Sequence, residues 1–190
     1  MRLALEQAQQ AAAAGEVPVG AALVGPRGEI LAVAGNQTER SGDPTAHAEM
    51  LCIRQAAARL GGWRLLDSTL YVTLEPCPMC AGALLQARVG SVVYGARNRL
   101  LGADGSWIAM LPREADSNSG SSSSSSDEGF SGAGARPASA GKPHPFHPAL
   151  AVRRGVLEGE CSSAMRSFFQ GRRLDQMARS SSSSDDKGWS

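Results

Sequence analysis

Apolar residues recur along this chain with two different spacings, one typical of helices and the other of strands. Helical spacing predicts helices over residues 1–14, 46–60, 78–88 and 158–173. Short, largely apolar runs predict strands over residues 17–25, 29–35, 69–74, 91–95 and 151–156. The first two strands are joined by a turn and form a hairpin, and helices and strands alternate after it. This alternation predicts an α/β fold with a partly parallel sheet.

The hydrophobic pattern stops after residue 112. Residues 113–144 are rich in Ser and Gly and cannot bury enough apolar surface to order themselves, so they are predicted to be a disordered insertion. The pattern resumes over 145–174, which are predicted to be the C-terminal strand and helix of the same domain as 1–112. Residues 175–190 contain another Ser run and are predicted to be a disordered tail.

Length and charge narrow the classes of protein without choosing one. A chain of 190 residues fits one domain with appendages. Its net charge of +1 does not by itself indicate a nucleic-acid partner. No apolar run approaches the ~20 residues of a membrane span, and residues 1–15 resemble a helix rather than a signal or transit peptide. Of the four cysteines, Cys52 and Cys161 lie in helical patterns and are expected to be buried apolar residues.

Three short segments carry the chemistry: His47-Ala48-Glu49, Pro76-Cys77 and Cys80. Together they form H-x-E…P-C-x-x-C, the signature of the zinc nucleobase deaminases. One imidazole and two thiolates fill three positions around Zn²⁺ and leave the fourth for water, as in catalytic zinc sites. Glu49 is close enough to His47 to move the protons of that water. His47 and Cys80 fall in the first turns of predicted helices, whose positive ends favour thiolates.

Two other interpretations of these residues are a redox pair and a structural metal site. A redox CxxC would not explain His47-Ala48-Glu49. A structural zinc would need a fourth side-chain ligand, for which Cys52, His144 and His147 are the candidates. The combined pattern favours one catalytic Zn²⁺ per chain, bound by His47, Cys77 and Cys80.

Beyond the zinc motif, six segments resemble the TadA-type tRNA adenosine deaminases: residues 18–21, 43–49, 70–83, 93–97, 154–157 and 168–173. The resemblance covers about residues 1–112 and 145–173. It implies a three-layer cytidine-deaminase-like fold, with a five-stranded mixed sheet flanked by helices, and a homodimer. It also implies that Glu49 is the catalytic proton shuttle and that the wobble adenosine of a tRNA is hydrolysed to inosine.

The resemblance assigns substrate contacts as well. Asn36, in the loop before the site, matches a substrate-contacting Asn, although a turn residue is the alternative reading. The backbone N–H of Ala48 lies where the family contacts substrate or water. Asn98 follows Arg97 at a position where bacterial members commonly have Asp, a difference that affects contacts to the nucleotide backbone.

The long insertion, residues 100–107 and the His-Pro-Phe-His-Pro stretch look more like the deaminase domain of the plastid tRNA-arginine deaminases of plants, which are much longer proteins. This resemblance implies that the chain is a catalytic C-terminal portion. It also implies plastid tRNA-Arg with an ACG anticodon as substrate and the chloroplast as location, with the cytoplasm as alternative.

The zinc motif does not decide between RNA and a free base, since guanine deaminases share it. Phe168 and Phe169 lie in the last predicted helix, and Arg97 and Arg99 follow the fourth predicted strand. Further arginines accompany the two phenylalanines: Arg153, Arg154, Arg166, Arg172 and Arg173. Arginines bind phosphates and aromatic rings stack on splayed bases, so this set favours the anticodon stem-loop of a tRNA. The alternative is a solvated basic face with at least one phenylalanine in the core. A free guanine or cytosine deaminase, or an inactive zinc-stabilised RNA-binding module, also remains open.

Overall fold

The computed structural model describes residues 1–112 and 150–182 and contains one five-stranded mixed sheet. The strands are β1 (Gly20–Val24), β2 (Ile30–Gly35), β3 (Thr69–Leu74), β4 (Ser91–Ala96) and β5 (Ala151–Arg153). Their order in the sheet is β2-β1-β3-β4-β5. Strand β1 is antiparallel to β2 and β3, and β3, β4 and β5 are parallel. The predicted hairpin and partly parallel sheet are both confirmed.

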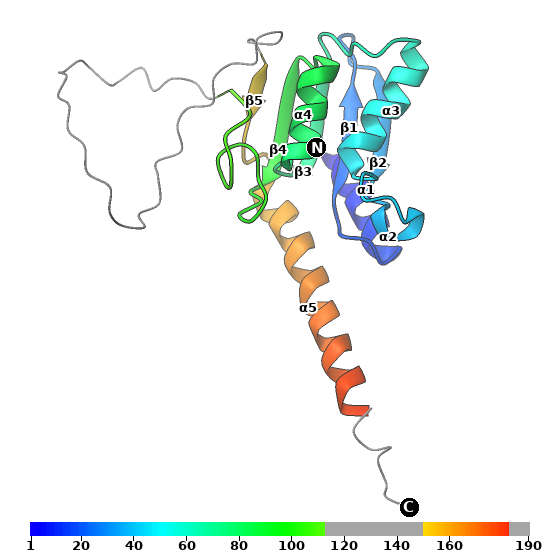
Figure 1. Ribbon diagram of the computed structural model, residues 1–190, viewed down its shortest axis with the longest axis vertical. Coiled ribbons are helices and arrows are strands. Elements are labelled where there is room, and N and C mark those ends of the chain that lie inside the picture. The colour runs from blue at the N-terminus through cyan, green and yellow to red at the C-terminus, as the bar shows by residue number, and fades with distance from the viewer. Residues whose placement is uncertain (113–149, 183–190) are drawn as a thin grey trace, which may run out of the picture.

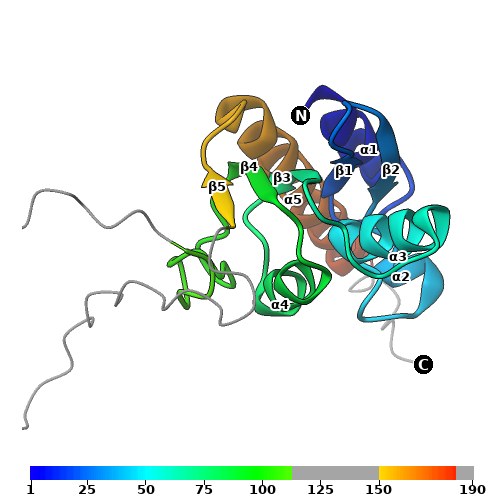
Figure 2. The same cartoon turned by 90° about the horizontal axis from the view of Figure 1, so that it is seen from above.

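Helices cover both faces of the sheet and complete three layers (Figures 1 and 2). Helices α3 (Ala48–Leu60) and α4 (Pro78–Ala87) pack on one face. Helices α1 (Arg2–Ala13) and α5 (Glu158–Ser182) pack on the other. The predicted cytidine-deaminase-like layering is confirmed. No helix among the described residues has the length and apolar character needed to cross a bilayer.

Small residues let α1 lie against the sheet at very short range. Ala4, Ala8 and Ala11 recur on one side of α1 and are buried. They face Gly20 of β1 and Gly35 of β2, which are paired in the sheet. A Cβ at Gly20 would lie 2.0 Å from the carbonyl oxygen of Ala4. This close packing fixes the end of α1 and the segment that follows it beside the end of β2.

The two cysteines outside the metal motif are buried in the hydrophobic core. Cys52 of α3 is fully buried, and Cys161 of α5 is 1% exposed. The Cys161 thiol lies against Gly95 of β4, where a Cβ would come within 2.3 Å of its sulfur. The prediction that both cysteines are buried apolar residues is confirmed, and Cys161 marks where α5 docks on the sheet.

Several element boundaries differ from prediction, including the start of β1 at Gly20 instead of residue 17. Helix α3 begins at Ala48, so His47 precedes the helix instead of lying within its first turn. A short helix, α2 (Thr38–Ser41), occupies part of the predicted loop. Strand β5 ends at Arg153. Helix α5 continues to Ser182, so the tail predicted to be disordered from residue 175 is helical as far as 182.

The continuation of α5 has a physical reason in its composition. Residues 174–179 are Leu, Asp, Gln, Met, Ala and Arg, most of which have high helix propensity, and an existing helix extends through such residues at little cost. The helix therefore does not end where the Ser run begins, at Ser180, but continues to Ser182. Residues 113–149 and 183–190 lie outside the described residues. They include the predicted insertion at 113–144 with His144, as well as His147 and the last residues of the tail.

Replacing Gly20 with Ala tests the close contact between α1 and β1. The added methyl group would meet the backbone of α1, which has no rotamer to change, so we expect a loss of about 1–3 kcal/mol in unfolding free energy. Gly171→Ala is the control, because nothing lies within 4 Å of that position in α5. It should be neutral or stabilise the helix by up to about 1 kcal/mol. Equal effects of the two variants in thermal and urea unfolding would contradict the proposed close packing.

Candidate metal centre and active site

The N-termini of α3 and α4 meet at the sheet edge where β2 and β3 end. His47 is the N-cap of α3 and Cys77 is the N-cap of α4, both with extended backbone conformation. Pro78 follows as the first residue of α4, a position at which its missing N–H costs no hydrogen bond. Cys80 lies in the first turn of the same helix. Two positive helix ends therefore surround the three predicted ligands.

The three ligand atoms are arranged as a tetrahedral zinc site requires. His47 Nδ1 lies 3.7 Å from Cys77 Sγ and 3.5 Å from Cys80 Sγ, and all three atoms are within 4.8 Å of one another. Zn–N and Zn–S bonds of about 2.1 and 2.3 Å at tetrahedral angles place nitrogen and sulfur about 3.6 Å apart. One nitrogen and two sulfurs are also a donor set that zinc prefers. The residues present therefore fit one Zn²⁺.

A structural zinc with four side-chain ligands is not supported by the described residues. Cys52, one candidate for a fourth ligand, lies in the core and does not belong to the cluster. The other candidates, His144 and His147, lie outside the described residues. The cluster thus offers three protein ligands, as catalytic zinc sites do.

The two cysteines share a proton in a hydrogen bond. The bond from Cys80 lowers the pKa of Cys77 to about 4, and the same bond together with burial raises the pKa of Cys80. The contact with Cys77 also raises the pKa of His47, against the opposing effect of burial. Cys77 is thus a thiolate at neutral pH, and the proton that a metal ion has to displace is on Cys80.

Glu49 is an acid held in a low-dielectric environment beside these ligands. Its side chain is buried in the first turn of α3, and burial raises its pKa. A carboxyl group with a raised pKa exchanges protons more readily near neutral pH than an exposed one. Its position next to the ligands and its environment both suit proton transfer.

A cavity of about 280 Å³ opens over these groups. This size lies at the lower end for small-molecule sites and suits a single nucleobase. The predicted residues Asn36 and Asn98 both line the cavity. Ala48 is the first residue of α3, so its N–H has no partner within the helix. The lining residues are Val17, Val19, Asn36, Thr38, Glu39, His47, Glu49, Leu74, Glu75, Cys77, Asn98 and Leu101.

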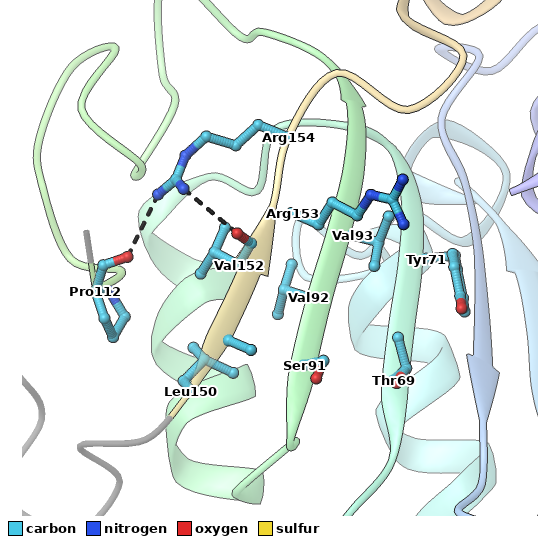
Figure 3. Close-up of a pocket in the computed structure, with 11 residues that line it drawn as sticks. Thr69, Tyr71, Ser91, Val92, Val93, Pro112, Leu150, Val152, Arg153 and Arg154 are labelled. Atoms are coloured by element: carbon cyan, nitrogen blue, oxygen red, sulfur yellow. Dashed lines mark hydrogen bonds between the residues drawn. The ribbon is translucent and has the colours of Figure 1, made fainter. Parts of the chain in front are cut away.

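A second depression, of about 450 Å³, lies away from the metal cluster over β3, β4 and β5 (Figure 3). Its described lining combines Tyr71, Arg153 and Arg154 with aliphatic and hydroxyl residues and includes no His, Cys, Asp or Glu. It therefore offers neither a metal ligand nor an acid for proton transfer, and the smaller cavity is the candidate active site.

The aromatic and basic residues of α5 lie outside the catalytic cavity. Phe168 is half-buried and Phe169 is 40% exposed, so the expectation that at least one of them is in the core is wrong. Their rings meet edge to face with centroids 5.4 Å apart, and the Arg172 guanidinium lies 5.2 Å from the Phe168 ring. Arg173 is exposed. Phe168 and Arg172 flank α1 and the segment before β1 instead of entering the core.

A different arginine of α5 lies nearer the cavity. Arg166 lines a hollow together with Arg97 and Arg99, and this hollow shares Leu74 and Asn98 with the catalytic cavity. The predicted residue Arg97 is thus beside the mouth and exposed. Arg166 is one of the arginines of this helix that the sequence favours as phosphate contacts, although nothing in the sequence distinguishes it from Arg172 and Arg173.

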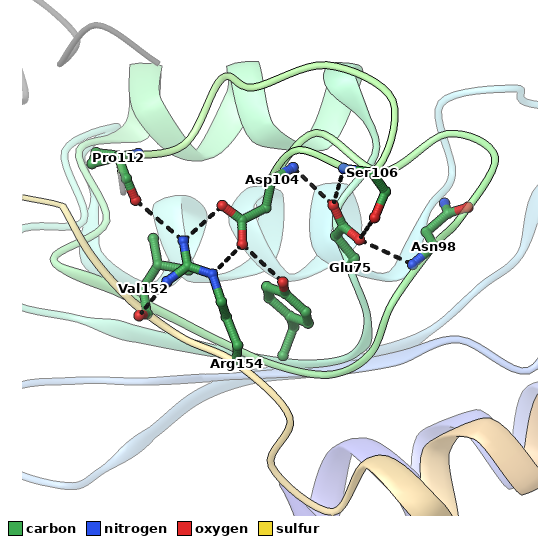
Figure 4. Close-up of polar contacts among 8 residues, drawn as sticks. Glu75, Asn98, Asp104, Ser106, Pro112, Val152 and Arg154 are labelled. Carbon is green, nitrogen blue, oxygen red and sulfur yellow. Dashed lines mark hydrogen bonds and ion pairs between the residues drawn. The ribbon is translucent and has the colours of Figure 1, made fainter. Parts of the chain in front are cut away.

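Glu75, which sequence reasoning missed, shapes the cavity wall. Its carboxylate is 1% exposed and accepts hydrogen bonds from the backbone N–H groups of Asn98 (3.1 Å) and Asp104 (2.9 Å) and from the Ser106 hydroxyl (Figure 4). A Cβ at Gly102 would lie 2.3 Å from this carboxyl group, so any other residue there would displace Glu75 from these hydrogen bonds. The loop that carries Asn98 is therefore wrapped around Glu75.

The same loop is fixed at its other end by a buried ion pair (Figure 4). The fully buried carboxylate of Asp104 accepts hydrogen bonds from Tyr94 (2.8 Å) and from two nitrogens of Arg154 (2.5 and 2.8 Å). Arg154 also donates to the carbonyl oxygens of Pro112 and Val152. One guanidinium thus ties together the two chain segments that flank residues 113–149.

Comparison with known proteins agrees with this arrangement. The profile of the cytidine and deoxycytidylate deaminase zinc-binding region matches residues 1–96. The chain is 39% identical to a tRNA-specific adenosine deaminase of Haemophilus influenzae, over 93% of this chain and 84% of that protein. It is 53% identical to a chloroplastic tRNA(adenine(34)) deaminase of Arabidopsis thaliana over 90% of this chain, but spans only 12% of that much longer protein.

Solved structures give the same picture. A structure from a study of A-to-I editing by tRNA:A34 deaminases matches 86% of this chain and 96% of its own, with a TM-score of 0.64 and 36% identity. A guanine deaminase from Nitrosomonas europaea matches with a TM-score of 0.60 and 22% identity, over 87% of this chain and 80% of its own, which shows a shared fold only.

Zinc affinity should depend on pH through the proton on Cys80. Because the pKa of His47 is raised, binding at neutral pH should release the cysteine proton and part of the His47 proton, so log apparent affinity should rise with pH with a slope between about one and two. The slope should fall toward about one at alkaline pH, where His47 is neutral before the metal binds. Competition with a chelator measures this. Cys52→Ala should leave the slope unchanged, and a pH-independent affinity would mean that Cys80 is not a ligand.

Proposed function

Because this chain belongs to the cytidine and deoxycytidylate deaminase family, among relatives that are tRNA-specific adenosine deaminases, we propose that it hydrolyses the wobble adenosine of a tRNA to inosine and ammonia. The observation that carries the proposal is a three-ligand zinc cluster with a buried acid beside it, in a chain that aligns with 84% of a tRNA-specific deaminase. A cavity suited to one nucleobase supports it.

In this proposal His47, Cys77 and Cys80 hold Zn²⁺, which when bound supplies a Lewis acid that makes a water molecule nucleophilic near neutral pH. Glu49 accepts a proton from the attacking water and delivers it to a ring nitrogen of adenine. A C–O bond forms at C6. Glu49 then takes the proton of the new C6 hydroxyl and passes it to the amino group, the C6–N bond breaks as the C6 carbonyl forms, and ammonia leaves. The burial of Glu49 keeps it able both to accept and to donate in this cycle.

The walls of the cavity orient the base. Asn36 and Asn98 each bring a side-chain amide to it, and the Ala48 N–H points from the positive end of α3. Leu74 and Leu101 supply apolar contact. Closing a base between these groups excludes bulk water from the reacting atoms.

We further propose that arginines outside the cavity bind the RNA backbone. Arg97, Arg99 and Arg166 surround the adjoining hollow, where the phosphates next to the reacting nucleotide would lie. Arg172, with its guanidinium over Phe168, and Arg173 extend the basic surface along α5, and Phe169 is exposed enough to stack on a base. These contacts distinguish an anticodon stem-loop from free guanine or cytosine, which would need none of them.

The finer assignments rest on the relatives. The chloroplast is proposed because a 53% identical relative is chloroplastic. Plastid tRNA-Arg with an ACG anticodon is proposed from the sequence resemblance alone. A homodimer is proposed from the resemblance to the family. It is consistent with the exposure of large apolar side chains such as Leu100 and Trp107, which a partner could cover.

Separating metal binding from proton transfer tests the assignment of Glu49. Glu49→Gln keeps the shape of the buried side chain but cannot shuttle a proton, so turnover of the tRNA should fall about 10²–10⁴-fold while zinc content stays near one per chain. Cys80→Ala should lose zinc and stability together. Inosine formation, metal analysis and thermal unfolding are the measurements. Loss of zinc from folded Glu49→Gln protein would make Glu49 a ligand and overturn its assigned role.

The contribution of α5 to RNA binding is tested by removing two charges at once. Arg172→Ala/Arg173→Ala should weaken binding of the anticodon stem-loop and flatten the slope of log affinity against log salt by about one to two units. The matched control is Arg27→Ala/Arg64→Ala, which removes two exposed arginines near the end of β1 and the start of β3, away from the metal cluster. If both double variants bind alike, the α5 arginines form only a solvated surface and the free-base alternative gains support.

A further inference from the structure

Glu16 is a buried acid that stands just behind the wall of the catalytic cavity. It lies in the segment between α1 and β1 and is fully buried, next to Val17, which lines the cavity. Its carboxylate accepts three hydrogen bonds. One comes from Asn36 Nδ2 (3.1 Å), and the others come from the backbone N–H groups of Glu39 (3.2 Å) and Arg40 (2.8 Å). Three N–H donors thus converge on one carboxylate group and hold it in place.

This arrangement determines how Asn36 is presented to the cavity. A carboxylate only accepts hydrogen bonds, so the amide of Asn36 has to turn its nitrogen, not its oxygen, toward Glu16. Its oxygen lies on the other side, 3.4 Å from the Thr38 hydroxyl. Rotation of the amide by half a turn would place two acceptors against each other in a buried site, which is strongly unfavourable. The remaining N–H and the oxygen of the Asn36 amide are therefore presented to the cavity in one fixed arrangement.

We infer that Glu16 is a positioning residue that sets the base selectivity of the cavity by fixing the orientation of the Asn36 amide. The inference rests on the proposed deamination of adenosine. Adenine offers an acceptor at N7 beside the donor of its 6-amino group, the pair that an Asn amide matches, whereas guanine offers two acceptors at N7 and O6. An amide whose N–H and oxygen are held in one arrangement can bond both N7 and the 6-amino group of adenine. On guanine its oxygen would meet a second acceptor, so one of the two hydrogen bonds is lost.

The decisive variant is Glu16→Gln, which keeps side-chain size but adds a donor. Asn36 can then satisfy the introduced amide with either its oxygen or its nitrogen, and its order is no longer fixed. The substrates are synthetic anticodon stem-loops carrying either adenosine or 7-deazaadenosine at the reacting position. Wild type should lose about tenfold in kcat/KM on the 7-deaza substrate, the effect of one hydrogen bond to N7. In Glu16→Gln the adenosine rate should fall about tenfold and the 7-deaza penalty should shrink to about threefold or less.

Controls separate this role from general stability. Asn36→Ala should abolish the 7-deaza penalty, and adding Glu16→Gln to it should change the ratio no further. Asp104→Asn replaces another fully buried carboxylate, one that binds Tyr94 and Arg154, so it should lower stability yet keep the wild-type penalty. Zinc content should be the same in Glu16→Gln and wild type. Glu16→Asp, too short to hold Asn36 and both backbone N–H groups at once, is the substitute if Glu16→Gln does not fold, and it should also narrow the penalty.

The outcomes are distinguishable. Wild type that forms no inosine in the stem-loop would overturn the proposed function and the adenine assignment together. Active wild type with the same 7-deaza penalty as folded Glu16→Gln would overturn the role of Glu16 alone and leave the proposed function standing.

Discussion

The convergence of two helix N-termini on one point is the constraint on which the site depends. His47 and Cys77 are both N-caps, so their side chains leave the backbone at the positive ends of α3 and α4. Bringing two thiols and an imidazole within 4.8 Å would be costly if the thiols had to ionise in an apolar environment. The unpaired N–H groups of both helices offset that cost. The sheet and its connections serve to hold these two helix starts together.

Three glutamates near the cavity are buried, and their surroundings give them different roles. Glu16 and Glu75 each collect N–H donors from an irregular segment beside the cavity: Glu16 from the start of α2, Glu75 from the loop that carries Asn98. Such donors hold both carboxylates in place and make these groups fixed anchors. For Glu49, burial is the dominant influence and raises its pKa. The same side chain is thus structural where donors surround it and suited to proton transfer where burial outweighs them.

Sequence reasoning succeeded where a sequence pattern marks the residues that interact. Hydrophobic spacing predicted the sheet and its helices, and the H-x-E and P-C-x-x-C motifs predicted a metal cluster of His47, Cys77 and Cys80 although His47 and Cys77 are 30 residues apart. It missed Glu16 and Glu75 because no motif marks their partners: Glu16 bonds Asn36 twenty residues on, and Glu75 bonds Asp104 after 29. A lone acid between apolar residues is a weak signal without those partners. Phe168 and Phe169 were misplaced for a related reason, since helical spacing does not show how far a helix projects beyond the sheet.

Chemistry and selectivity therefore reside in different parts of the molecule. The three-layer fold also occurs in a guanine deaminase at 22% identity, so the fold does not decide which base reacts. What differs between sites on a shared fold is the irregular backbone at the sheet edge. Here that backbone consists of the segment between α1 and β1, the start of α2 and the loop from Asn98 to Ser106, each held by a buried carboxylate. Loops fixed in this way present amides at defined positions without the flexibility that would let a wrong base fit. Selectivity in this fold is thus a property of how the loops are anchored, as much as of which side chains line the cavity.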